Sequence, residues 1–162
     1  MLNSLSRTCK YAIQAMIFIA SLNTDEPILA KQIAGALSIP REFLNKVMQR
    51  LVKAGFLVSV KGPGGGFLLA KDPKDITIFD IVKAIDGVEW FNSCLLRVGE
   101  CDEGNPCAVH EFWVKIRNQV RAILDHESLA DLVKELRNGK RVLQFAEDFI
   151  LLKKIKTQMG IN

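Results

Sequence analysis

Three cysteines and one histidine lie within seventeen residues of one another in the second half of the chain. They are Cys94, Cys101, Cys107 and His110, and the only other cysteine in the 162 residues is Cys9. The residues between them include glycine, aspartate and proline, which favour a loop. Thiolate and imidazole groups bind zinc, copper and iron–sulfur centres. The group therefore predicts a metal site or a redox site.

The spacing of these cysteines favours an iron–sulfur cluster over a structural zinc ion. Six residues separate Cys94 from Cys101, five separate Cys101 from Cys107, and two separate Cys107 from His110. A structural zinc site usually contains two cysteines that are two to four residues apart, and no such pair is present. The two irons of a cluster each need two ligands, which suits wider spacing. Redox-active or idle thiols remain the alternative.

Composition and charge indicate a globular protein with a basic N-terminal third. Hydrophobic residues make up 49% of the chain, which is enough for a packed core, and the formal net charge is +4. Residues 1–61 carry a net charge of +5 and residues 62–162 a net charge of −1. Such an imbalance is typical of a phosphate-binding region, although a solvated basic face would produce it too.

The apolar run between Ala12 and Leu22 predicts a buried first helix. It is too short to span a bilayer, and no small-residue cleavage site of a signal peptide follows it. We therefore expect a cytoplasmic protein with no membrane partner, in which the thiols stay reduced.

Residues 1–86 have the pattern of a winged helix-turn-helix domain. Apolar periodicity predicts helices over 7–22, 29–37 and 41–54, and three residues join the last two, of which the second is basic. This is the helix-turn-helix pattern. Two β-prone runs, 56–60 and 67–70, then flank the segment Lys61-Gly-Pro-Gly-Gly-Gly66. They predict a hairpin that would form the wing, although a plain β-turn would explain the glycines equally well.

The second half is predicted to be helical except around the cysteines. We expect helices over 77–86, 107–124, 128–136 and 140–158, and an irregular cysteine-rich, cluster-binding loop over 87–106. In the long helix, apolar residues recur every three or four positions, as in a seam between two helices: Val109, Trp113, Ile116, Val120 and Ile123. The seam predicts dimerisation through residues 107–162, and the alternative is a core helix of the same subunit. The fold class is mainly α with a small β-hairpin.

Polar side chains outside the apolar stripe of the helix 41–54 could contact DNA. Arginine and lysine suit guanine edges or phosphates, whereas asparagine and glutamine suit adenine. We expect those nearest the start of the helix to reach bases and the later ones to meet phosphate, and an ordinary solvated helix is the alternative. The candidates, with those of the wing, are Arg41, Glu42, Asn45, Lys46, Gln49, Arg50, Lys53, Lys61, Gly64 and Gly65.

Two segments, RTCKYAIQAMIFIA and IPREFLNKVMQRLVKAGFLVSVKGPGGGFLLAKD, followed by three cysteines, resemble the IscR/NsrR/CymR family over about residues 3–136. These are bacterial dimeric winged-helix transcription regulators of the Rrf type. The resemblance implies that the N-terminal half binds double-stranded operator DNA, that the long helix forms the homodimer, and that the loop before it can hold an iron–sulfur cluster. It implies a regulator controlled by its cluster, and not an enzyme. The alternative is a cluster-independent regulator that uses thiol switching or a protein partner, as in the CymR branch.

The resemblance also suggests a ligand set and three departures from the family. Cys94, Cys101 and Cys107 would be thiolate ligands, and His110 matches the histidine of the IscR pattern, which favours a 2Fe–2S cluster. NsrR-type relatives use a carboxylate of the other subunit where Lys10 stands here, so Cys9 of the other subunit is the alternative fourth ligand, unless Cys9 is a core residue. The departures are one extra residue before Cys101, Asn45 in place of a glutamate that discriminates between DNA sequences, and Lys61 in place of a minor-groove arginine.

Overall fold

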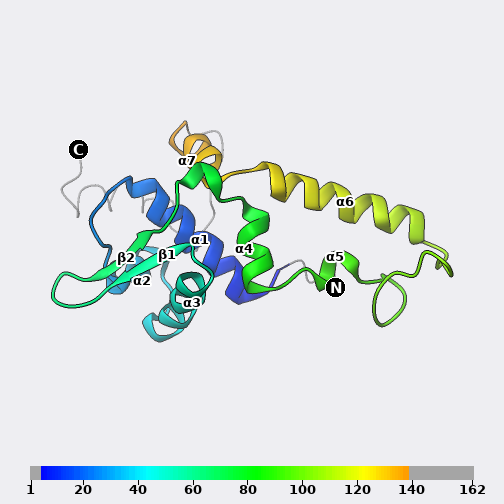
Figure 1. The fold of residues 1–162 in the computed structure, drawn as a ribbon, viewed down its shortest axis with the longest axis horizontal. Coiled ribbons are helices and arrows are strands. Elements are labelled where there is room, and N and C mark those ends of the chain that lie inside the picture. The colour runs from blue at the N-terminus through cyan, green and yellow to red at the C-terminus, as the bar shows by residue number, and fades with distance from the viewer. Residues whose placement is uncertain (1–4, 139–162) are drawn as a thin grey trace.

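The structure, a computed structural model, describes residues 5–138 (Figure 1). Its helices and strands follow the chain as α1 (Arg7–Leu22), α2 (Ala30–Leu37), α3 (Arg41–Lys53), β1 (Leu57–Val60), β2 (Gly66–Leu69), the 3-10 helix η1 (Pro73–Asp75), α4 (Ile78–Ile85), α5 (Glu89–Asn92), α6 (His110–His126) and α7 (Leu129–Arg137). The mainly helical fold with one small hairpin is the predicted fold class. The helix expected over residues 140–158 lies outside the described residues.

Helix α1 is the centre of the core. Its apolar residues point in nearly every direction because α2, α3, α4 and α7 all pack against it. Cys9, Ala12 and Met16 are fully buried. Ser6 caps the helix by accepting a hydrogen bond from the Cys9 N–H. The helix is therefore a core element, as the sequence predicted.

Helices α2 and α3 form the helix-turn-helix. The turn between them uses a left-handed Ser38, with φ 52°, and buries Ile39. Leu44 and Leu51 of the α3 stripe are fully buried, which leaves the polar side of the helix outward. Helix α3 ends at Lys53, where the N–H groups of Gly55 and the next residue bond the carbonyls of the last turn and Gly55 has φ 78°.

The wing is an antiparallel hairpin in which β1 pairs with β2, with Val60 opposite Gly66. It is attached to the helical core by a bridge between Ile28 and Phe67. A side chain at Gly66 would overlap the Ile28 carbonyl, so the close contact between wing and core requires glycine at this position.

The second half of the chain leaves the core and returns to it. Figure 1 shows α5 and the cysteine loop extending away from the helix-turn-helix, with α6 running back to α7. Helix α7 then packs on α1 and buries Leu129 and Val133 in the common core. Backbone hydrogen bonds from Ile78 to Glu127 and from Leu129 to Ile76 join the starts of α4 and α7.

Two boundaries differ from the sequence prediction. The loop expected over 87–106 contains the one-turn helix α5, and the long helix begins at His110 and not at Cys107. Residue Val109, which precedes the helix, offers no capping side chain, and the His110 N–H bonds the Cys107 carbonyl in a tight turn. Cys107 is therefore a loop residue, like the other two cysteines. No helix within residues 5–138 is long and apolar enough to cross a membrane.

Candidate functional site

The three cysteines of the loop gather at the base of α6. The Sγ atoms of Cys94 and Cys107 are 3.7 Å apart, and the Cys101 side chain interacts with that of Cys94. All three are free thiols. Two backbone hydrogen bonds of 2.9 Å close the loop, from Cys94 N–H to the Gly99 carbonyl and from Cys101 N–H to the Asn92 carbonyl. We call Cys94, Cys101 and Cys107 the cysteine centre.

Cys94 and Cys107 are joined by a thiol–thiol hydrogen bond, and the distance between their sulfurs is also close to that of two thiolates on one metal ion. With metal–sulfur bonds of about 2.3 Å and tetrahedral angles, two sulfur ligands lie roughly 3.8 Å apart. The observed 3.7 Å needs almost no rearrangement. Yet no group of three or more histidine, cysteine, aspartate or glutamate side chains in residues 5–138 is arranged to hold a metal ion. The geometry therefore provides one pair of ligands.

The thiols differ in their electrostatic surroundings. Backbone N–H groups of Arg97 and Leu96 point at the Cys94 sulfur and lower the pKa of Cys94 to about 7. Burial raises the pKa of Cys101, against the opposing effect of Arg117. Cys94 is therefore the thiol that most readily supplies a thiolate, the form that binds metals and attacks oxidants.

The Ser93 carbonyl holds the cysteine centre on α6. It accepts hydrogen bonds from Trp113 Nε1 at 2.7 Å and Arg117 Nη1 at 3.0 Å, and the Cys101 thiol approaches it at 3.8 Å. A carbonyl oxygen has two lone pairs for three donors, and the thiol is the weakest of them. Loss of the Cys101 proton on metal binding would leave the two stronger bonds intact.

The positions of His110 and Cys9 bear on the fourth ligand. His110 is the first residue of α6, half-buried, one turn after Cys107. Cys9 is fully buried in α1, and burial, reinforced by Asp86, raises the pKa of its thiol to about 12. This is the arrangement expected of a core cysteine. The ligand role of His110 stays a prediction.

Aromatic rings connect the cysteine centre to the DNA-binding core. The rings of Trp113 and Trp90 meet edge to face at 6.0 Å, Trp90 meets Phe91 at 4.8 Å, and Phe91 meets Phe79 at 5.2 Å. Phe79 and Phe91 belong to the core cluster that surrounds α1. Packed rings transmit displacement because protein interiors are close-packed. The sequence pattern placed Trp113 in a seam between two helices, whereas its side chain is buried within its own subunit.

Most of the predicted DNA-contacting side chains of α3 are exposed, and Asn45 is half-buried. Arg50 differs from the others, since its guanidinium donates a hydrogen bond to the Ile85 carbonyl at the end of α4. The neighbouring Asp86 accepts a 2.7 Å hydrogen bond from the Ser6 N–H at the start of α1. Arg50 therefore has a structural partner in addition to any contact with DNA.

The predicted wing residues fall into two groups. Lys61 and Gly64 are exposed, and Gly64 has φ 77°. Gly65 is buried, and a side chain there would overlap the Val60 carbonyl across the hairpin. Gly65 consequently shapes the turn, whereas Lys61 and Gly64 are open to a ligand.

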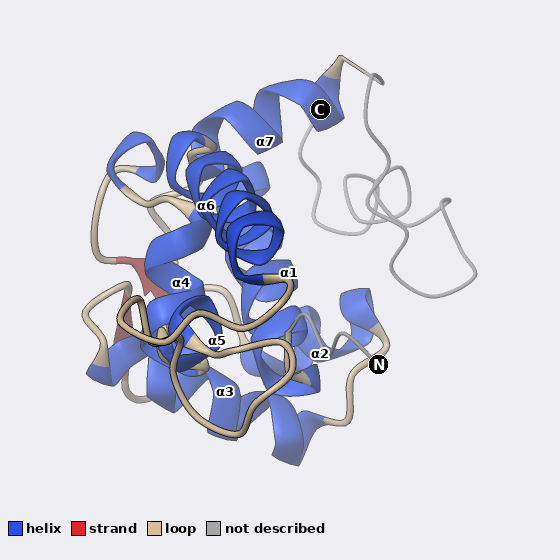
Figure 2. Ribbon diagram, turned by 90° about the vertical axis from the view of Figure 1, so that its right-hand side faces the viewer, coloured by secondary structure: helices blue, strands red, loops and turns tan. Residues whose placement is uncertain are grey.

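The outer face of α6 carries an exposed apolar stripe. Phe112, Ile116 and Ile123 are 71%, 49% and 62% exposed, while Trp113 and Val120 of the predicted seam turn inward. Figure 2 views α6 nearly end-on, with α7 above it and α4 and α5 below it. An exposed stripe at helical spacing is typical of a helix that pairs with another.

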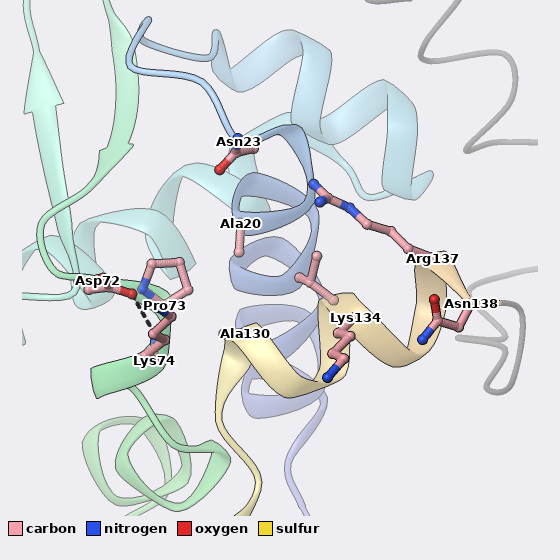
Figure 3. A pocket seen from close by; sticks show the side chains of 10 residues that line it. Ala20, Asn23, Asp72, Pro73, Lys74, Ala130, Lys134, Arg137 and Asn138 are labelled. Carbon is pink, nitrogen blue, oxygen red and sulfur yellow. Dashed lines mark hydrogen bonds between the residues drawn. The ribbon is translucent and has the colours of Figure 1, made fainter.

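A separate hollow of about 450 Å³ lies between the end of α1, η1 and α7 (Figure 3). Lys74, Lys134 and Arg137 line it, together with Asp72, and Arg137 donates a 3.0 Å hydrogen bond to the Ser21 carbonyl. No residue of the cysteine centre or of α3 belongs to its lining. No motif marks it in the sequence, because its lining comes from three separate segments.

Comparisons with known proteins agree with this arrangement. The sequence model of the Rrf2 family, described as an iron-dependent transcriptional regulator, matches residues 5–135. A protein of Aquifex aeolicus named as an HTH-type transcriptional regulator is 41% identical over 79% of this chain and 90% of its own length. The regulator IscR of Yersinia pseudotuberculosis is 32% identical over 85% of this chain and 81% of its own length.

Solved structures show the same fold. CymR of B. subtilis, described as the global cysteine regulator, superposes with a TM-score of 0.69 at 30% identity and covers 83% of this chain and 98% of its own. T. potens IscR superposes with a TM-score of 0.69 at 27% identity and covers 93% of this chain and 97% of its own. An oxidized form of S. aureus CymR reaches a TM-score of 0.66 at 27% identity, with coverage of 81% and 96%.

Proposed function

The chain belongs to the Rrf2 family of transcriptional regulators, and on that premise we propose that an iron–sulfur cluster in the cysteine centre controls its binding to operator DNA. Like its relatives it is a regulator and not an enzyme. The family is described as iron-dependent, which suits this control. We expect it to act in the cytoplasm, where thiols stay reduced.

The observation that carries the proposal is the 3.7 Å separation of the Cys94 and Cys107 sulfurs. Cys94, Cys101, Cys107 and His110 would together hold a cluster of the 2Fe–2S type. The cluster, when bound, would supply a one-electron redox centre that oxidants or nitric oxide can damage.

DNA binding would use two copies of the helix-turn-helix. The exposed stripe of Phe112, Ile116 and Ile123 on α6 would pair two subunits, so that two α3 helices and two wings meet a pseudo-palindromic operator. Residues 1–86 would form the DNA-binding domain, 87–106 the cluster-binding loop and 107–162 the dimerisation region. Helix α7 also packs on α1, so a movement of α6 reaches the DNA-binding core directly.

The rings from Trp113 to Phe79 suggest how the cluster could affect the DNA-binding core. Cys94 follows Ser93 directly and the Cys101 thiol contacts the Ser93 carbonyl, so a change in the ligation of these cysteines would be felt at Ser93. The Ser93 carbonyl is bonded to Trp113, whose ring meets Trp90. The displacement would therefore arrive at α4, whose end holds Arg50 of the recognition helix.

Anaerobic purification tests the proposal. The protein is expected to be coloured and to contain iron and acid-labile sulfide, and Cys94→Ala and Cys101→Ala should lose both. DNA affinity of the loaded protein should differ from that of the same sample after chelation. Colourless protein that binds stoichiometric zinc would rule out the cluster.

A thiol switch is the second candidate, and the same pair of sulfurs supports it. Cys94 has a pKa of about 7 and its sulfur lies 3.7 Å from that of Cys107. Hydrogen peroxide would take two electrons from these thiols to form one S–S bond, and its O–O bond would break as both oxygens and the two thiol protons leave as two molecules of water. CymR, a structural neighbour, has been solved in an oxidized form. Equal DNA affinity with and without cluster, together with a change on peroxide treatment that Cys107→Ser abolishes, would favour this function.

A further inference from the structure

The hollow between the end of α1, η1 and α7 is large enough for a small molecule. Its volume of about 450 Å³ lies within the usual range of ligand sites. Figure 3 shows Ala20 of α1 between Asp72–Lys74 on one side and α7 on the other. Ala20 and Ala130 contribute only methyl groups to the lining, which leaves the space between the longer side chains open.

Positive charge dominates the polar lining of this hollow. Lys74, Lys134 and Arg137 are cations, and Asp72 is the only carboxylate among the described residues that line it. Asp72 already accepts a 2.9 Å hydrogen bond from the Lys74 N–H at the start of η1. The bond from Arg137 to the Ser21 carbonyl uses one of the five N–H donors of the guanidinium. A lining in which cations outnumber carboxylates in this way favours an anion.

The lining connects the wing to the long helix α6. Residues 70–72 join strand β2 of the wing to η1, which carries Lys74. Residues 127–128 join α6 to α7, which carries Lys134 and Arg137. The elements η1 and α7 pack against each other, and α7 packs on α1. A ligand that bound cations of both η1 and α7 would therefore hold the wing and α6 in one relative position.

We propose that this hollow binds a small hydroxylated anion, such as a phosphate monoester or a hydroxycarboxylate, and that the bound anion changes the affinity for DNA. The inference goes beyond the proposed function, because it needs neither a cluster nor any cysteine. The two lysine ammonium groups and the Arg137 guanidinium would bind the phosphate or carboxylate oxygens. The Asp72 carboxylate and the side-chain amides of Asn23 and Asn138 would bind the hydroxyl groups.

Thermal melting of the full chain with four probes tests binding. The probes are glycerol phosphate, citrate, inorganic phosphate and glycerol, all at the same ionic strength. Glycerol phosphate or citrate at about ten times its Kd should raise the melting temperature by roughly 3–6 °C. Inorganic phosphate should give a smaller shift because it carries no alcohol groups, and glycerol should give none because it is uncharged. The larger of the two organic-anion shifts distinguishes a phosphate ligand from a carboxylate ligand.

Three variants and a matched control test where the anion binds. Lys74→Gln and Lys134→Gln should each raise the Kd about threefold, as expected for ion contacts open to solvent, and the double variant about tenfold. Ala130→Glu adds a carboxylate to the lining in the first turn of α7, where the helix dipole favours an acid, so it should abolish binding and leave the fold stable. Lys115→Gln removes an exposed charge from α6, outside the lining, and should bind like the wild type.

DNA titrations at constant ionic strength test the regulatory part. Saturation with the organic anion should change the affinity for a DNA duplex at least threefold, and Ala130→Glu should remove this effect. If neither organic anion shifts the melting temperature, or if the shift persists in Ala130→Glu and in the double lysine variant, the binding site is wrong. Binding that leaves the DNA affinity unchanged overturns the regulatory role. Since all of these measurements use protein without a cluster, a failure here leaves the proposed function untouched.

Discussion

Arg50→Ala should mainly lower the stability of the fold, whereas Lys46→Ala should mainly weaken DNA binding. Both residues are exposed cations of α3, and both were predicted to contact DNA. The Arg50 guanidinium, however, bonds the Ile85 carbonyl at the C-terminal end of α4, where the helix dipole favours a positive charge. We expect Arg50→Ala to weaken the fold, and Lys46→Ala to weaken the contact with phosphate.

The sizes of the two effects follow from the structure. A hydrogen bond from a charged group contributes about 1.5–3 kcal/mol when buried, and solvent around the exposed Arg50 side chain reduces this to about 1 kcal/mol. For a chain of this length the loss lowers the melting temperature by roughly 2–4 °C. If Lys46 neutralises one phosphate in each subunit of a dimer, its loss reduces the slope of log affinity against log salt by about 1.8.

Thermal melting and DNA titrations over a series of KCl concentrations measure both quantities. A duplex of arbitrary sequence is sufficient, because phosphate contacts do not depend on sequence. Lys115→Ala, which removes an exposed charge from the middle of α6, is the control and should change neither quantity. If Arg50→Ala reduces the salt slope as much as Lys46→Ala and melts like the wild type, the structural role of Arg50 is wrong.

Three further predictions concern the wing and the core. Gly66→Ala should lower the free energy of unfolding by about 2 kcal/mol, because the new Cβ would overlap the Ile28 carbonyl. Gly35→Ala, where the new Cβ on α2 would meet open space, should raise the free energy of unfolding by about 0.5–1 kcal/mol. Urea titrations check both, and a neutral Gly66→Ala would contradict the packing argument. Burial raises the pKa of Cys9 from 9.0 to about 12. The stability of the wild type relative to Cys9→Ala should therefore be constant below about pH 9 and fall between about pH 9 and pH 12. A stability difference that stays constant across this range would refute the effect of burial on this thiol. The same variant should load iron normally, since the thiol is buried. Lys61→Ala should weaken binding to operator DNA at matched salt, and equal affinity would argue against a wing that contacts DNA.

Local sequence signals predicted the fold well where they were strong. The helices predicted over 7–22, 41–54 and 77–86, and the hairpin after the second of them, all appear close to where they were expected. Such signals act within one or two turns of chain, so the sequence contains them completely. The start of α6 was wrong by three residues, because Val109 offers no cap that would have marked it.

The cysteine centre could be predicted only in part. Residue types and spacing identified Cys94, Cys101 and Cys107, because ligand chemistry depends on the side chains themselves. Their supports were missed: Ser93 acts through its backbone carbonyl, and Arg117 looked like one more helix cation. The face of α6 that turns inward depends on tertiary packing, so the heptad spacing alone assigned Trp113 to the wrong partner.

The position of the cysteine centre explains how a small loop could regulate a distant helix. Figure 1 shows the loop at one end of α6 and the helix-turn-helix beyond the other end, so a local change needs a rigid connection. The Ser93 carbonyl provides its anchor, since Trp113 and Arg117 both bond this single atom. Any ligand that moves Cys94 must move Ser93 with it, because the two residues are adjacent. The rings of Trp113 and Trp90 are in contact, and α6 and α7 pack on the DNA-binding core. We therefore expect part of any displacement at the thiols to reach the core through Ser93, Trp113 and Trp90.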